Sequence, residues 1–141
     1  MNPSTIISVT KRFTFEASHI LNDPSLSKEE NQSIFGKCSR MHGHSYKLYV
    51  TVTADTLTNG MIINFRDLKR IVMESVIEKI DHRHINDMEG FDKNIPTAEN
   101  IASSIWKILE EEFHKNNIEC KIKRIRLYET ETGFADILEK S

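Results

Sequence analysis

The segment Cys38-Ser-Arg-Met-His42-Gly-His44 contains the residue types and the spacing of a metal site. Side chains alternate between the two faces of a β-strand, so His42 and His44, separated only by Gly43, project from the same face and can reach one ion. His19 ends another predicted strand, on the same parity as its apolar residues, and an adjacent antiparallel strand would place it beside the pair. Three neutral imidazoles with an open fourth position are the ligand set of a catalytic zinc ion.

Each of these residues also has a plainer explanation when it is taken alone. A His-Gly-His pair is commonly a surface or turn feature, and a single His19 is commonly a core histidine satisfied by hydrogen bonds. Cys38 lies four residues before His42, and three roles remain open for it: a fourth ligand, a base or nucleophile, or a small buried residue. His84 and His114 have no comparable neighbours, so we expect both to be solvated.

Two acidic residues extend the chemistry beyond the metal ligands. Asp81 precedes His82 at the end of a predicted helix, where the carboxylate can orient an imidazole that relays protons; the alternative is a helix cap. Glu129 shares the parity of Ile125 and Leu127, and if buried it must be hydrogen-bonded, for instance to an amino group and a ring N–H of a ligand. The alternative is that the strand ends there and Glu129 is exposed.

The elements that position these residues follow from hydrophobic periodicity and helix caps. A polar stretch at 22–37 is expected to be a loop or lid. The predicted elements, in order, are strands at 7–19 and 42–52, helices at about 65–80 (capped by Asn64) and 98–115 (capped by Thr97), and strands at about 119–131 and 134–139. This order predicts an α+β fold in which two helices cover one face of a four-stranded antiparallel sheet. Because the second face and the edges stay open, we expect self-association.

The composition restricts the class of protein. The 141 residues contain 19 Lys+Arg and 21 Asp+Glu, a net charge of −2, and we expect one domain over 1–141 with no nucleic-acid partner. No apolar run approaches the roughly 20 residues needed to span a bilayer, and Met1–Thr10 lacks the features of a secretion signal, so we expect a cytoplasmic protein without a membrane partner. Cys38 and Cys120 are then expected to be free thiols.

Taken together, the motifs resemble those of the family of 6-pyruvoyl-tetrahydropterin synthase and the bacterial 6-carboxy-tetrahydropterin synthase. The resemblance implies a tunnelling fold whose subunits form trimeric barrels stacked as a homohexamer, a dimer of trimers with active sites at subunit interfaces. It also implies a zinc ion bound by His19, His42 and His44. The segments that carry it are Phe13-Thr-Phe-Glu-Ala-Ser-His19, Cys38-x-x-x-His42-Gly-His44, Gly60-Met-Ile-Ile-Asn-Phe65, Asp81-His82-Arg-His-Ile-Asn86-Asp87, Pro96-Thr-Ala-Glu-Asn100 and Tyr128-Glu-Thr130.

The same resemblance implies a lyase that acts on 7,8-dihydroneopterin triphosphate. Glu129 would anchor the amino-pyrimidine edge of the pterin, with Thr97 and Glu99 near the ring. Zinc would acidify the side-chain hydroxyls, and triphosphate would leave by elimination. The residues implied to act in catalysis are Cys38 as a thiolate that moves a side-chain proton, Asp81 with His82 as a proton relay, and Glu129.

Two reactions of this family fit the sequence. The three residues between Cys38 and His42, with Ile85-Asn86-Asp87, resemble the carboxy-type enzyme of queuosine (deazaguanine) biosynthesis, which also releases acetaldehyde. Glu29-Glu30-Asn31, which leads into Phe35-Gly36-Lys37-Cys38, resembles the pyruvoyl type of tetrahydrobiopterin biosynthesis, and Asn64 departs from the Asp that is common before Phe in the carboxy type. We favour the carboxy-type reaction. Two other classes of function remain as alternatives: a binding module that holds a pterin or purine without turnover, and a structural zinc protein that unfolds when the ion is removed.

Overall fold

The computed structural model describes residues 2–140, so the ends of the predicted domain, Met1 and Ser141, lie outside the described residues. Two 3₁₀ turns, Gly36–Ser39 and Ile85–Asp87, and a π-helical turn, Met73–Ile77, occur between or within the main elements. The main elements are β1 Ser8–His19, α1 Lys28–Phe35, β2 His42–Thr53, α2 Phe65–Val72, α3 Glu78–Ile80, β3 Arg83–His84, α4 Ala98–Lys115, β4 Lys121–Tyr128 and β5 Phe134–Leu138.

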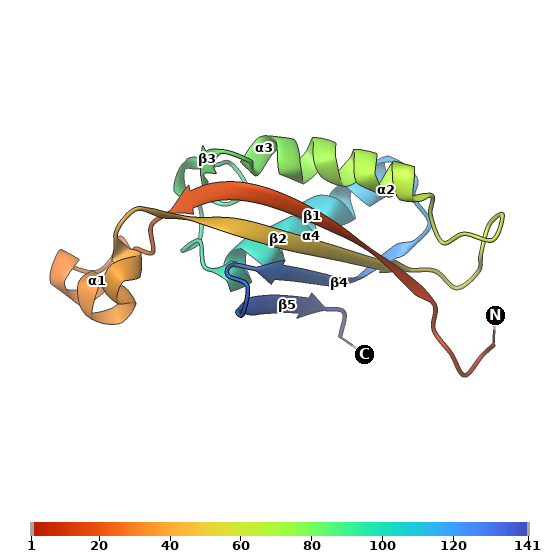
Figure 1. Cartoon of the computed structure of the whole chain (residues 1–141), viewed down its shortest axis with the longest axis horizontal. Helices are drawn as coiled ribbons and strands as arrows, with labels where there is room; N and C mark the ends of the chain where they lie inside the picture. Colours follow the sequence, from red (N-terminus) through yellow and green to blue (C-terminus); the bar gives the residue numbers. More distant parts are fainter. Residues whose placement is uncertain (1, 141) are drawn as a thin grey trace.

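One sheet, in the order β3-β1-β2-β4-β5, forms the framework of the molecule. The helices α2, α3 and α4 lie on one of its faces (Figure 1). Strands β1, β2, β4 and β5 pair antiparallel, which confirms the predicted α+β arrangement. The sheet has five strands rather than the predicted four, because β3 pairs parallel with the end of β1. Two residues are too few to show the alternation from which a strand is predicted.

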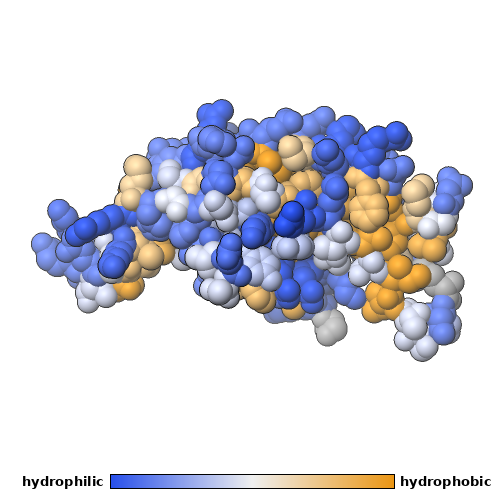
Figure 2. All heavy atoms as spheres, viewed as in Figure 1, coloured by the Kyte–Doolittle hydropathy of each residue, from blue (hydrophilic) through white to orange (hydrophobic). Residues whose placement is uncertain are grey.

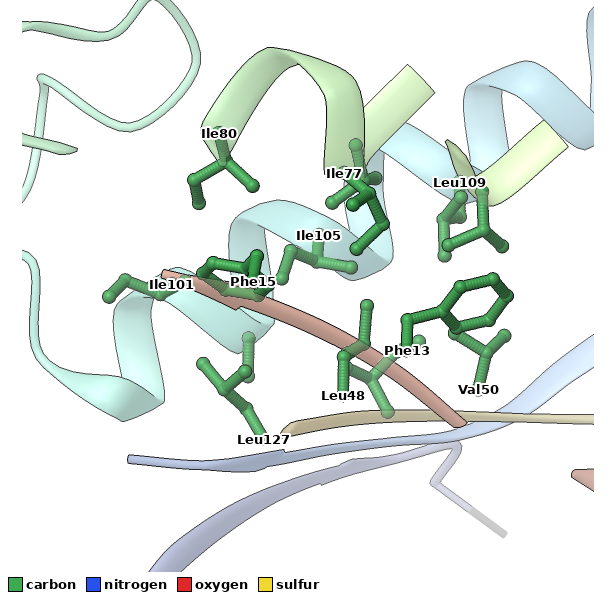
Figure 3. Close-up of a cluster of buried hydrophobic side chains, with 14 of the residues drawn as sticks. Phe13, Phe15, Leu48, Val50, Ile77, Ile80, Ile101, Ile105, Leu109 and Leu127 are labelled. Carbon is green, nitrogen blue, oxygen red and sulfur yellow. The ribbon is translucent and has the colours of Figure 1, made fainter. Parts of the chain in front are cut away.

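The hydrophobic core fills the space between the sheet and the helices (Figure 3). Alternate residues of β1 and β2 face it, as the period of two requires. Burying one large aliphatic side chain contributes about 1.5–3 kcal/mol, so this layer supplies most of the stability. The labelled side chains come from β1 (Phe13, Phe15), β2 (Leu48, Val50), the helical stretch before β3 (Ile77, Ile80), α4 (Ile101, Ile105, Leu109) and β4 (Leu127).

Both predicted helices are confirmed. α4 spans Ala98–Lys115, and the Thr97 side chain accepts a hydrogen bond from the Asn100 backbone N–H at 3.2 Å. The helix expected at 65–80 begins after an Asn64 cap and continues without a break to Ile80. Its middle turn, Met73–Ile77, is π-helical, which hydrophobic periodicity does not predict.

The polar stretch at 22–37 contains a helix, so the prediction of a loop or lid was wrong there. Ser27 and Glu30 form a reciprocal capping box at the start of α1. The Asn31 side chain is buried, accepts from the Asp23 N–H at 2.7 Å and donates to nearby backbone carbonyls. These polar contacts hold the segment in place with little apolar burial, which is why hydrophobic periodicity did not reveal it.

The two ends of the molecule have different surfaces (Figure 2). Hydrophobic residues gather where the N-terminal segment and the loop before α2 lie, and Ile6, Met61 and Phe65 are exposed there. The α1 end is mainly hydrophilic. Among residues 2–140, no helix has the length and apolar character to cross a bilayer.

Candidate metal centre

The pairing of β1 with β2 brings the three predicted metal ligands together. His19 is directly opposite His42, and Ala17 is opposite His44. One nitrogen from each of the three imidazoles can be chosen so that all three lie within 4.8 Å of one another. His19 is fully buried, and its ring centroid lies 4.5 Å from that of His42 and 5.1 Å from that of His44. The cluster therefore forms on the core side of the sheet, where β1 ends and β2 begins.

Backbone carbonyls set the tautomers of two of these histidines. Nδ1 of His19 lies 2.7 Å from the Pro96 carbonyl oxygen, and Nδ1 of His42 lies 2.7 Å from that of Arg40. A carbonyl oxygen only accepts hydrogen bonds, so each neutral ring carries its proton on Nδ1 and a lone pair on Nε2. The two Nε2 atoms are 2.9 Å apart. Two lone pairs at this distance repel each other unless a cation lies between them.

His44 supplies a third nitrogen with the same requirement. Its Nε2 atom is buried and has no hydrogen-bond partner among the described residues. The nearest carboxylate oxygen, Oε1 of Glu129, is 3.8 Å away, beyond hydrogen-bond distance. A buried nitrogen without a partner is costly, and an ion bound by all three nitrogens would satisfy each of them. Three imidazole nitrogens, two of them oriented by carbonyls, fit a zinc ion with a free coordination position.

Burial also favours the neutral, metal-binding form of two of these histidines, His19 and His44. Desolvation lowers the pKa of His19, although its Pro96 contact acts in the opposite direction. Desolvation likewise lowers the pKa of His44, and the Glu129 carboxylate partly offsets the effect. Neutral imidazoles are the form that coordinates metals, so the site is prepared to bind an ion near neutral pH.

Tyr46 also contacts this site, although it is not among the site residues predicted from the sequence. The side chain is fully buried, and its hydroxyl lies 3.5 Å from Nδ1 of His19. Its ring stacks on Phe15 with centroids 4.8 Å apart, and burial raises the pKa of the phenol. Tyr46 follows His42 and His44 on the same strand parity, which was the available signal.

Asp81 and His82 form the predicted contact next to β3. Oδ1 of Asp81 lies 3.0 Å from Nδ1 of His82 and accepts from the Glu16 N–H at 2.9 Å. The hydrogen bond from Glu16 is the main cause of the lowered pKa of Asp81. His82 has a φ of 61° and a side chain that is 78% exposed. It lines a shallow depression of about 570 Å³ together with His44.

The remaining predicted site residues come from the turn before β2, the start of α4 and the end of β4. Cys38 is a partly buried free thiol in the turn before β2, and Thr97 adjoins the carbonyl that orients His19. Glu99 is exposed in the first turn of α4. Glu129 is intermediate between the two alternatives considered for it, with a side chain that is 29% exposed.

The sequence also gave expectations for three residues outside this set. Cys120 is a free thiol, as predicted, and is buried in the core. His114 is exposed as predicted. The expectation that His84 is solvated was wrong, because it is partly buried and its Nδ1 lies 2.9 Å from the Ser18 hydroxyl.

Comparisons with known proteins agree on one family. The family model described as 6-pyruvoyl tetrahydropterin synthase matches residues 8–140. The 6-pyruvoyl tetrahydrobiopterin synthase of Pongo abelii is 37% identical over 129 residues, covering 89% of this chain and 86% of that protein. The 6-carboxy-5,6,7,8-tetrahydropterin synthase of Haemophilus influenzae is 30% identical over 156 residues, covering 95% and 100%. The structure of 6-pyruvoyl tetrahydropterin synthase from Caenorhabditis elegans superimposes with a TM-score of 0.85 at 26% identity, covering 99% and 100% of the two chains. This likeness confirms the tunnelling fold.

Proposed function

This chain belongs to the 6-pyruvoyl tetrahydropterin synthase family of pterin synthases, and from that premise we propose that it is a zinc-dependent 6-carboxy-5,6,7,8-tetrahydropterin synthase of the cytoplasm. Its substrate is 7,8-dihydroneopterin triphosphate, and its place is in queuosine biosynthesis. The observation that carries the proposal is the group of three imidazoles, one buried and two partly buried, whose Nε2 atoms are left for an ion.

In this proposal, separate residues of the chain bind the metal and the pterin. His19, His42 and His44 hold the zinc ion, which when bound acts as a Lewis acid toward the hydroxyls of the substrate side chain. The Glu129 carboxylate, 3.8 Å from Nε2 of His44, accepts hydrogen bonds from the amino group and the ring N–H of the pterin. These bonds place the side chain of the substrate at the metal. Thr97, which follows the residue whose carbonyl contacts His19, contacts the pterin ring in this proposal.

Proton transfer falls to three further residues. Cys38, in the turn that leads into His42, accepts a proton from the substrate side chain. The Asp81 carboxylate accepts a hydrogen bond from the Glu16 N–H and contacts Nδ1 of His82. Nε2 of His82 is therefore the ring nitrogen that exchanges protons. Glu99 supports binding from the first turn of α4.

The second part of the proposal is that the sites are completed in a homohexamer, a dimer of trimers. Asp81 and His82 stand beside the edge strand β3, where a second copy can approach them. The face of the sheet opposite the helices carries polar side chains such as Arg12 and Lys47, and no helix of residues 2–140 covers it (Figure 1). Light scattering on the purified protein tests this assembly, and a monomer would contradict it.

The two reactions of the family differ in their atom balance. The carboxy-type reaction converts substrate and one water molecule into 6-carboxytetrahydropterin, acetaldehyde and triphosphate. The pyruvoyl-type reaction eliminates triphosphate and consumes no water. The three-residue gap between Cys38 and His42 supports the first. The second candidate, 6-pyruvoyl-tetrahydropterin synthase, is supported by the 37% identity with the enzyme named for it in Pongo abelii.

A single incubation distinguishes the candidates. Zinc-loaded protein is mixed with 7,8-dihydroneopterin triphosphate, the pterin product is identified by mass, and acetaldehyde is assayed in the same tube. A carboxy-pterin with acetaldehyde supports the proposal, and a pyruvoyl-pterin without acetaldehyde supports the second candidate. Unchanged substrate would contradict both and favour a non-catalytic pterin-binding module.

A further inference from the structure

The chain after α3 runs beside the last residues of β1 and bonds to them at successive positions. The His82 N–H donates to the Glu16 carbonyl at 2.6 Å. Beyond it, β3 pairs in parallel with Ala17 and Ser18. This ladder ends at His84, one residue short of the level of the metal ligand His19.

Asn86 continues the ladder with its side chain. Its Oδ1 atom accepts from the Ile20 N–H at 2.8 Å, and its Nδ2 atom donates to the Ile20 carbonyl at 2.8 Å. A side-chain amide offers one donor and one acceptor in the same arrangement as a peptide group. Asn86 therefore fixes the backbone directly after His19, at the point where β1 has ended and no strand pairs with it.

Asn100 fixes the other contact of His19. Its Nδ2 atom donates to the Ile95 carbonyl at 2.8 Å, and the Thr97 N–H donates to the same oxygen at 2.8 Å. These two bonds hold the tight turn centred on Pro96. The Pro96 carbonyl accepts from Nδ1 of His19, so the turn decides where the imidazole proton points.

We propose that Asn86 and Asn100 are positioning residues that hold the His19 imidazole in its metal-binding tautomer and orientation. The inference rests on the metal site of the proposed function and adds residues that act through His19 without touching the ion. Groups that orient metal-bound histidines through hydrogen bonds contribute about 10–100-fold to metal affinity. Asn86 acts on the backbone of the ligand, and Asn100 acts on the acceptor of its N–H.

The test measures the affinity of the full-length chain for zinc by competition with a chelator, in the absence of substrate. Asn86→Asp keeps the shape of the side chain but replaces the donor to the Ile20 carbonyl with an acceptor. Asn100→Asp does the same to the donor to Ile95. We expect each to weaken zinc binding about tenfold or more. Asn116→Asp is the matched control, because Asn116 donates to the Glu112 carbonyl at the far end of α4 and should leave the affinity unchanged.

A second measurement separates positioning from general loss of structure. ¹⁵N NMR of the metal-free protein reports which ring nitrogen of His19 carries the proton. The unaltered chain should show the Nδ1–H tautomer, and Asn100→Asp should show a mixture of tautomers, whereas the control keeps one. If Asn86→Asp does not fold, Asn86→Ala removes both bonds without adding a charge and is measured instead.

The outcomes also separate this inference from the proposed function. Zinc binding by the unaltered chain with equal affinity in the Asn86, Asn100 and Asn116 variants would overturn the inference and leave the metal site intact. Absence of zinc binding by the unaltered chain would overturn both.

Discussion

Adding zinc to the metal-free protein should raise its unfolding temperature, and His44→Ala should abolish the rise. At a zinc concentration 100 times the dissociation constant, binding to the folded state alone contributes about 2.7 kcal/mol. An unfolding entropy of about 2.1 cal/mol/K per residue gives about 0.3 kcal/mol/K for 141 residues. The expected rise is therefore about 9 °C, measured by calorimetry at one protein concentration with and without zinc.

The His44→Ala variant provides the sharper comparison. In the metal-free protein Nε2 of His44 is buried without a hydrogen bond, at a cost of about 1–3 kcal/mol. Removing the imidazole relieves this cost and offsets part of the lost packing, so the metal-free variant should unfold within a few degrees of the unaltered chain. An equal zinc-induced rise in both proteins would refute the three-histidine site. Unfolding of the unaltered chain on metal removal alone would favour a structural ion instead.

Three further predictions concern catalysis, pH and the core. Cys38→Ala should abolish turnover in the pterin assay while zinc affinity is retained; full activity would exclude it as the proton acceptor. Burial lowers the pKa of His19 and His44 below the ordinary 6.5, so the unfolded chain takes up protons first and the metal-free protein should lose stability as the pH falls below about 6.5; a urea midpoint that stays constant from pH 7.5 to 5.5 would contradict this. Leu127→Ala should cost about 2–5 kcal/mol in urea unfolding, against about 0.5 kcal/mol or less for the exposed Leu138→Ala; similar losses would contradict the position of the core.

The parts of the fold that were predictable are those with strong periodicity. The alternation along β1 and β2 and the capped apolar stripe of α4 gave their positions within one or two residues, since burial on one face leaves a direct record in sequence. The metal cluster followed, because His19, His42 and His44 lie on the core-facing parity of paired strands.

The missing parts are held by polar contacts that leave no such record. α1 depends on a capping box and on the buried Asn31, and the Ser27-to-Glu30 spacing was the signal that could have revealed it. The carbonyls that orient His19 and His42 belong to backbone, which any residue type supplies. Their positions follow only from the assembled turns, so no pattern of side chains could identify them.

The π-helical turn at Met73–Ile77 shifts the rotational phase of the helix that carries Asp81. Leu68, Ile71 and Val72 are buried before the turn, Val76 and Ile77 are buried within it, and Ile80 is buried after it. Each residue of an α-helix rotates the chain by about 100° about the helix axis. Deleting one residue from this turn should therefore leave the first part of the helix packed but rotate Asp81 away from the Glu16 N–H.

Such a deletion would separate the Asp81–His82 pair from the Glu16 backbone of the sheet. Faster exchange of the Glu16 amide hydrogen, with unchanged exchange in α4, would report it. An unchanged Glu16 amide would mean that the chain after Ile80 compensates for the lost residue. The number of residues in this helical turn thus determines the direction in which the Asp81 side chain points, although Asp81 lies beyond the end of the helix.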